Sequence, residues 1–229
     1  MLYRITQWLS WPLFTLFFRF RSRGGHHVPA RGGCVIAANH ASYLDPLLIG
    51  AALPHRRVGF MAKEELFRFP VFGWAIRSMG AIPVRRGGIT PGAFRAFAGL
   101  LRDEGRVLVV FPEGTRTPDG RLGPGRRGVG AICLVAGVPV VPAYVTGSYA
   151  AWPRWRWLPR WGRFEVRFGA PLQWADRELE ATGDPSDALA TLMMNAIAQL
   201  EHPPVLEPSL RFLDGVRHLR RSRPSVGDA

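Results

Sequence analysis

The sequence predicts an α/β fold: a single domain with a mostly parallel mixed sheet flanked by helices on both faces. Short apolar runs rich in β-branched residues recur along the chain, each bounded by Gly, Pro or charge. Segments of helical character separate these runs, and such alternation is typical of a sheet covered on both sides. The length of 229 residues is also sufficient, because a chain of this size buries roughly 70–75% of its unfolded surface.

The expected strands and helices follow one another along the first 200 residues. The apolar runs predict strands at 34–38, 57–61, 81–84, 106–111, 140–146 and 163–168. The segments between them predict helices at 46–53, 70–79, 91–102 and 126–136. A last helix is expected at 185–200, because Asp184 is placed to cap it and Pro185 suits its first position.

The two ends of the chain differ from this pattern. The uncharged run 5–18 would span about 21 Å as a helix, short of the roughly 30 Å hydrocarbon core of a bilayer. We therefore expect residues 1–23 to form a membrane-associating helix that lies in the interface, with Trp8 and Trp11 at headgroup level. The alternative is a helix packed on the domain's own core. Residues 24–201 then form the main domain, and 202–229 a basic, flexible tail.

Charge points to an anionic partner. The net charge is +13, and residues 1–173 alone carry 24 basic and 8 acidic side chains. Nucleic acid, anionic lipid and phosphorylated metabolites all fit this balance. No nucleic acid is expected as partner, because the arginines are scattered among buried-strand patterns without a recognised binding motif. Cys34 and Cys133 lie in apolar runs and are expected to be buried free thiols, and no metal site is expected.

The first candidate for chemistry is the pair His40 and Asp45, which follows an expected strand. Imidazole titrates near working pH and is the natural general base, and a carboxylate can orient it. On a continuous helix a spacing of five residues puts the two side chains on different faces, so their contact requires a strand-to-helix turn. Pro46 at the first helical position would make Asp45 the N-cap. Alone, the pair could equally be a helix cap beside a polar residue at the end of a strand.

Three further segments accompany this pair. The run 111–117 (FPEGTRT) follows the most apolar expected strand, and its Arg116 can hold phosphate oxygens with two hydrogen bonds. Arg85 and Arg86 end the segment 80–86 and are candidates for a phosphate, or for a solvated basic edge. The apolar run 138–142 (VPVVP) can shape a wall of a site but carries no polar chemistry.

In this order the segments resemble the motifs of the glycerolipid acyltransferase family, which includes the 1-acyl-glycerol-3-phosphate acyltransferases. The resemblance covers roughly residues 34–150 and rests on Asn39, His40 and Asp45; Lys63, Glu65, Leu66, Pro70 and Gly73; Gly80, Ile82 and Arg86; the run 111–116; and the run 138–142. Two positions depart from the family pattern: Arg85 stands where an acid is frequent, and Arg126 where Lys is frequent. Both keep or add positive charge, but they leave the acceptor lipid open.

The resemblance implies a glycerol-3-phosphate acyltransferase-like fold and a set of roles. His40 would deprotonate the acceptor hydroxyl and Asp45 would orient it, without an acyl-enzyme intermediate. Substrate-binding residues would be Asn39, Lys63, Arg86, Glu113, Gly114, Thr115 and Arg116. The donor would be acyl-CoA or acyl-carrier protein, with no further cofactor, and the acceptor a lysophospholipid. The protein would attach peripherally to the cytoplasmic face of the cell membrane, on its anionic surface.

Rival functions are an acyltransferase for another lyso-lipid or for glycerol-3-phosphate, a basic binding module, and an inactive membrane adaptor. A serine hydrolase is disfavoured because the sequence has no Gly-x-Ser-x-Gly elbow. Outside the motifs, residues 152–161 interleave four tryptophans with three arginines. Such a run is typical of a membrane-docking loop. It is equally compatible with an aromatic cluster packed over the sheet, with arginines on the indoles.

Overall fold

The computed structural model describes residues 19–78, 80–84, 91–181 and 183–202. Its centre is a seven-stranded sheet in the order β1-β7-β6-β2-β5-β3-β4. The strands are β1 (Arg21–Arg23), β2 (Cys34–Ala38), β3 (Val58–Lys63), β4 (Ala81–Val84), β5 (Val107–Val110), β6 (Val140–Thr146) and β7 (Glu165–Phe168). Neighbouring strands run parallel except β6 and β7, which are antiparallel. The predicted mostly parallel mixed sheet is therefore confirmed.

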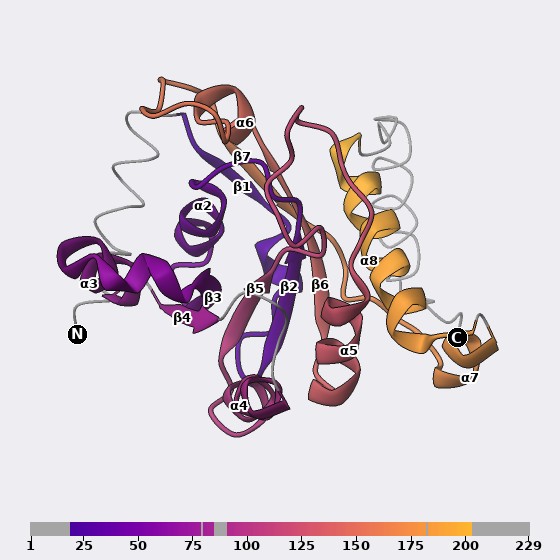
Figure 1. Cartoon of the computed structure of the whole chain (residues 1–229). Helices are drawn as coiled ribbons and strands as arrows, with labels where there is room; N and C mark the ends of the chain where they lie inside the picture. Colours follow the sequence, from indigo (N-terminus) through magenta and orange to yellow (C-terminus); the bar gives the residue numbers. More distant parts are fainter. Residues whose placement is uncertain (1–18, 79, 85–90, 182, 203–229) are drawn as a thin grey trace, which may run out of the picture.

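Helices cover both faces of this sheet, as predicted. Figure 1 shows α2 and α3 on one side of it and α5 and α8 on the other. The longer helices are α2 (Asp45–Ala52), α3 (Pro70–Ser78), α4 (Pro91–Arg102), α5 (Arg127–Ala136) and α8 (Pro185–Glu201). Shorter ones are η1 (Gly25–His27), η2 (Glu64–Arg68), α6 (Ser148–Ala151) and α7 (Asp176–Ala181). The sequence patterns did not predict these four, which have at most six residues each.

The central strand β2 is buried on both sides, which explains its unbroken apolar sequence. Ile36 packs in one cluster with Leu48 and Ile49 of α2. Val35 belongs to a second cluster, with residues of α4, α5 and α8 such as Met193. Alternate residues of a strand point to opposite faces, so β2 joins the two halves of the core. Cys34 and Cys133 are buried free thiols, as expected, and burial raises the pKa of each to about 12.

The helix expected over residues 1–23 does not reach residue 23. Residues 1–18 lie outside the described residues, but Arg21–Arg23 form strand β1 rather than the end of a helix reaching residue 23. This strand pairs with Glu165–Arg167, and Arg23 Nε lies 2.9 Å from Glu165 Oε1. Three exposed polar residues give no apolar pattern, so the strand is recognisable only through its partner. None of the helices in the described ranges has the length and apolar character that crossing a bilayer requires.

Candidate active site

The site lies where the neighbouring parallel strands β2 and β5 end at the same edge of the sheet. In α/β folds this is the edge at which ligands bind. Asn39 and His40 follow β2, and Phe111 to Arg116 follow β5. Two backbone contacts join the two turns: His40 N–H donates to Glu113 Oε1 (2.9 Å), and Thr117 N–H donates to the His40 carbonyl (2.8 Å). The backbone of His40 is therefore held from both sides.

The predicted contact between His40 and Asp45 is present. His40 Nδ1 lies 2.9 Å from Asp45 Oδ2, and the Asp45 side chain is fully buried. The same Oδ2 accepts hydrogen bonds from the N–H groups of Ala41 and Ser42, each at 2.7 Å. Because Oδ2 already accepts these two hydrogen bonds, the contact assigns Nδ1 as the donor, and in a neutral imidazole Nε2 then keeps its lone pair. The imidazole is thus held in the tautomer that a general base requires.

The expectation that Asp45 caps helix α2 was wrong. The helix begins at Asp45 itself, Leu44 is the N-cap, and the N-cap makes no side-chain capping hydrogen bond. Instead the carboxylate faces back to the turn 41–42 and to His40. Asp45 Oδ1 is buried and has no hydrogen-bond partner among the described residues. The carboxylate therefore accepts hydrogen bonds from the turn and lies against the imidazole, and it does not cap the helix.

Phe111 fixes the plane of the imidazole. The two rings are stacked, with centroids 3.9 Å apart and an interplanar angle of 15°. The His40 side chain remains 19% exposed, so the imidazole is not sealed from solvent. Sequence reasoning did not assign Phe111 this role. Its position immediately after the apolar strand β5, beside the end of β2, was the available signal.

Glu113 connects the turn of His40 to the loop that contains Gly123. Its carboxylate is buried and accepts hydrogen bonds from the N–H groups of His40 (2.9 Å) and Gly123 (3.3 Å). Burial raises the pKa of Glu113, and these two hydrogen bonds oppose that rise. Its backbone carbonyl accepts a hydrogen bond from Arg126 Nε at 3.0 Å. Both oxygens of the side chain are thus engaged in holding loops in place.

Gly114 is required by the geometry of the same turn. Its φ of +67° lies in the left-handed region that favours glycine. A Cβ at this position would also lie 2.6 Å from Arg126 Cδ. The positive φ therefore favours glycine here, and a larger residue would also have to displace the Arg126 side chain, which lies across the turn.

Arg116 places a positive charge beside Tyr43. Its guanidinium carbon lies 3.5 Å from the centre of the Tyr43 ring, a close cation–π contact. Its Nη1 is buried and has no hydrogen-bond partner among the described residues. Tyr43 is two residues before Asp45, so the arginine is placed next to the turn that carries the His40–Asp45 pair. Tyr43 lies between the motif residues His40 and Asp45, at a position that the motif leaves unspecified, and the sequence therefore gave no signal for this contact.

The other residues expected at the site are differently placed. The buried Asn39 amide joins β2 to β6: Nδ2 donates to the Val145 carbonyl (3.1 Å), and Oδ1 accepts from the Val145 N–H (2.7 Å). Thr115 is exposed beside Gly114, and Lys63 is exposed at the end of β3, two strands from β2. Arg86 lies outside the described residues. The described ranges contain no cluster of three or more His, Cys, Asp or Glu that could hold a metal ion.

Comparison with known proteins identifies the family. Residues 19–146 match the sequence profile of the family described as Acyltransferase, which is more than half of the chain. This chain belongs to the Acyltransferase family. The matched region contains both turns and the His40–Asp45 pair. The enzyme class predicted from the motifs is therefore confirmed at the level of an acyltransferase.

Similar members of the family share one description. A 1-acyl-sn-glycerol-3-phosphate acyltransferase of Bacillus subtilis is 29% identical over 77% of this chain and 85% of its own length. A 1-acyl-sn-glycerol-3-phosphate acyltransferase of Pseudomonas aeruginosa is 30% identical over 79% of this chain and 66% of its own length. A chloroplastic one from Brassica napus is 34% identical over 62% of this chain, but over only 41% of its own length. This acyltransferase thus spans less than half of that plant relative and most of the Bacillus one.

The fold agrees with a solved structure of the same family. The crystal structure of the 1-acyl-sn-glycerophosphate (LPA) acyltransferase PlsC from Thermotoga maritima superimposes with a TM-score of 0.70. The two proteins are 26% identical, and the match covers 89% of this acyltransferase and 81% of that chain. The α/β architecture predicted from the sequence is therefore the architecture of a known member of the family.

Proposed function

We propose that this acyltransferase transfers a fatty acyl group from acyl-CoA or acyl-carrier protein to the sn-2 hydroxyl of 1-acyl-glycerol-3-phosphate, which yields phosphatidic acid. The observation that carries the proposal is the His40–Asp45 pair, joined at 2.9 Å and set beside the turn that holds Arg116. Relatives described as acting on this acceptor support the choice of substrate. The enzyme would work at the cytoplasmic face of the membrane as a peripheral protein.

The proposed mechanism is a direct transfer. The acceptor hydroxyl gives its proton to His40 Nε2 as its oxygen attacks the thioester carbonyl. The buried negative charge of Asp45 stabilises the imidazolium that forms. When the tetrahedral intermediate collapses, the C–S bond breaks and the imidazolium returns the proton to the leaving thiolate. Atoms and charge balance without a covalent enzyme intermediate, and the products are the ester and the free thiol.

Arg116 is the proposed ligand of the acceptor phosphate. A guanidinium can bind phosphate oxygens through two parallel hydrogen bonds, and Nη1 of this arginine has no partner among the described residues. Stacking on Tyr43 holds the group in one orientation, which lowers the entropy lost on binding. Lys63, Arg86 and Thr115 are proposed as further contacts to the substrates, and Asn39, Glu113 and Gly114 as residues that shape the turns around them.

Product analysis tests the acceptor directly. Purified enzyme is incubated with each donor and a panel of acceptors: 1-acyl-glycerol-3-phosphate, other lysophospholipids and glycerol-3-phosphate. We expect mass spectrometry to show phosphatidic acid as the main product. Preference for a lysophospholipid without a terminal phosphate would contradict the assignment of the acceptor, while leaving the family assignment in place.

Replacing Arg116 with Ala is expected to raise the KM for 1-acyl-glycerol-3-phosphate by roughly 10- to 100-fold, since a charged hydrogen bond contributes about 1.5–3 kcal/mol. The KM for the acyl donor should change little. Steady-state kinetics with each substrate varied in turn provides the measurement.

Arg121 offers the matched control, because it is exposed on the same loop. Arg121→Ala removes the same charge and should leave both KM values near those of the wild type. An unchanged acceptor KM in the Arg116 variant would show that the phosphate binds elsewhere.

A serine nucleophile has little geometric support. Ser42 is the serine nearest to the pair in sequence, and it is fully buried. Its Oγ donates to the Trp152 carbonyl at 2.8 Å and accepts from Leu44 N–H at 3.2 Å. The hydroxyl is thus occupied by these two contacts, which hold the turn.

A further inference from the structure

A second surface of interest is the tryptophan segment, residues 152–163, which connects α6 to the strand β7. Three of its four tryptophans are largely exposed: Trp155 (69%), Trp157 (90%) and Trp161 (74%). Leu158 is 69% exposed beside them. Exposed large apolar side chains gathered in one short segment mark an interaction site, whereas single ones are ordinary.

The segment is held in shape at its base. Trp152 is half-buried against the core cluster that contains α2, and its Nε1 donates to the Arg156 carbonyl at 3.0 Å. Arg160 N–H donates to the Ala151 carbonyl at 2.8 Å, which closes the loop. The sequence left open whether these tryptophans dock on a membrane or pack on the protein itself, and the structure differs from one tryptophan to the next. Trp152 packs on the core, and the other three tryptophans are presented to the outside.

The charge around these tryptophans defines the partner. The segment carries Arg154, Arg156, Arg160 and Arg163, and the chain has no Asp or Glu from residue 120 to residue 164. None of these four arginines forms an ion pair within the described part of the chain. Indole rings favour the boundary between water and hydrocarbon, and arginines favour lipid phosphates. Together they match an anionic lipid surface.

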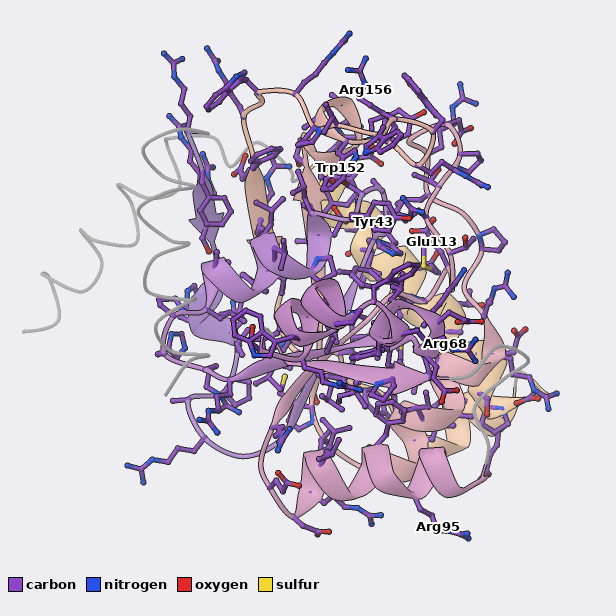
Figure 2. The ribbon with its side chains drawn as sticks, turned by 60° about the vertical axis from the view of Figure 1, so that its left-hand side comes forward. Tyr43, Arg68, Arg95, Glu113, Trp152 and Arg156 are labelled. Atoms are coloured by element: carbon purple, nitrogen blue, oxygen red, sulfur yellow. The ribbon has the colours of Figure 1, made fainter. Side chains whose placement is uncertain are left out.

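The segment is connected to the catalytic turn. The Trp152 carbonyl accepts the hydrogen bond of Ser42 Oγ (2.8 Å), and its ring lies 5.5 Å from that of Tyr43, which supports Arg116. Figure 2 shows Arg156, Trp152, Tyr43 and Glu113 following one another from the outer end of the segment toward the site. The surface and the site therefore belong to the same side of the molecule.

We propose that the tryptophan segment docks on an anionic bilayer surface, with Trp155, Trp157 and Leu158 at the depth of the headgroups. Docking there brings the turn of His40 to the membrane, where a lysophospholipid acceptor resides. This last consequence rests on the proposed function, whereas the docking itself does not. Binding to lipid is therefore measured without substrates.

The test compares full-length variants in co-sedimentation with phosphatidylcholine vesicles that contain about 30% phosphatidylglycerol. Trp155→Ser combined with Trp157→Ser should weaken binding by about ten-fold or more, because two exposed indoles are removed. Val135→Ser is the control, since Val135 is an apolar residue that is 49% exposed on helix α5, outside the tryptophan segment. Brominated lipids should quench less tryptophan fluorescence in the double variant than in the wild type.

A second pair of variants tests the charge. Arg154→Gln with Arg160→Gln should weaken binding to the anionic vesicles by about ten-fold and leave the weaker binding to pure phosphatidylcholine almost unchanged. The control is Arg95→Gln with Arg102→Gln, which removes the same charge from exposed positions on α4. Figure 2 places Arg95 at the opposite end of the molecule from Arg156. The control should bind as the wild type does.

Several results would overturn the proposal. One is wild-type affinity for anionic vesicles in the Trp155/Trp157 variant; another is an equal loss in the α4 control. If lipid-free protein dimerises and the tryptophan variant does not, the surface belongs to a second copy of the chain. Tighter binding to single-stranded RNA than to vesicles, lost in the same variant, would assign it to nucleic acid. Failure of acyl transfer with intact vesicle binding would refute only the proposed function.

Discussion

Replacing His40 with Ala is expected to lower the rate of acyl transfer by a factor of roughly 10²–10⁴, the usual contribution of a general base. The fold should persist, because the backbone hydrogen bonds of residue 40 to Glu113 and Thr117 remain when the side-chain contacts to Asp45 and Phe111 are lost. The measurement is the formation of phosphatidic acid from 1-acyl-glycerol-3-phosphate and an acyl thioester at saturating concentrations.

The control for this variant is His55→Ala, since His55 is exposed and follows helix α2. It should transfer acyl groups at the wild-type rate. Thermal unfolding of both variants separates loss of chemistry from loss of structure. Near-normal activity in the His40 variant would remove the imidazole from the mechanism.

Replacing Asp45 with Asn should lower activity by about 10²-fold while the protein stays folded. Three N–H donors converge on Oδ2, from Ala41, Ser42 and His40. They will select the orientation of Asn that presents its oxygen, so the turn and the tautomer of His40 are kept. What disappears is the negative charge that stabilises the imidazolium. The same kinetic assay, together with circular dichroism, tests both parts of this expectation.

Asp45→Leu is the variant to compare with Asp45→Asn. It removes the acceptor and leaves two buried backbone N–H groups without a partner, at a cost of about 1–3 kcal/mol each. It should therefore lose both stability and activity, whereas Asp45→Asn loses activity alone. Full activity in the Asp45→Asn variant would mean that the carboxylate only holds the turn.

The sequence predicted the elements that carry an apolar pattern. Strands β2, β4 and β6 have the expected bounds, and α4 does as well. The prediction of secondary structure failed for elements that are stabilised by segments distant in the sequence. Strand β1 consists of exposed polar residues and exists because β7 lies beside it. The antiparallel pairing of β7 with β6 is likewise not encoded by any local pattern.

For the site, the sequence predicted the two residues in contact but not their surroundings. The spacing of His40 and Asp45 requires a turn, and that turn is present. The cap assigned to Asp45 was wrong because three N–H donors outside the helix compete for its carboxylate. The Phe111 ring on His40 and the Tyr43 ring on Arg116 arise from segments about 70 residues apart in sequence. Only the pairing of β2 with β5 brings them together.

The most direct test of direct transfer is a single-turnover experiment with excess enzyme and an acyl thioester, with thiol release and intact protein mass recorded together. Our account predicts thiol release only after the lysophospholipid is added, and no acyl adduct on the protein at any time. Thiol release without acceptor, accompanied by an acyl adduct on Ser42 or another side chain, would contradict it.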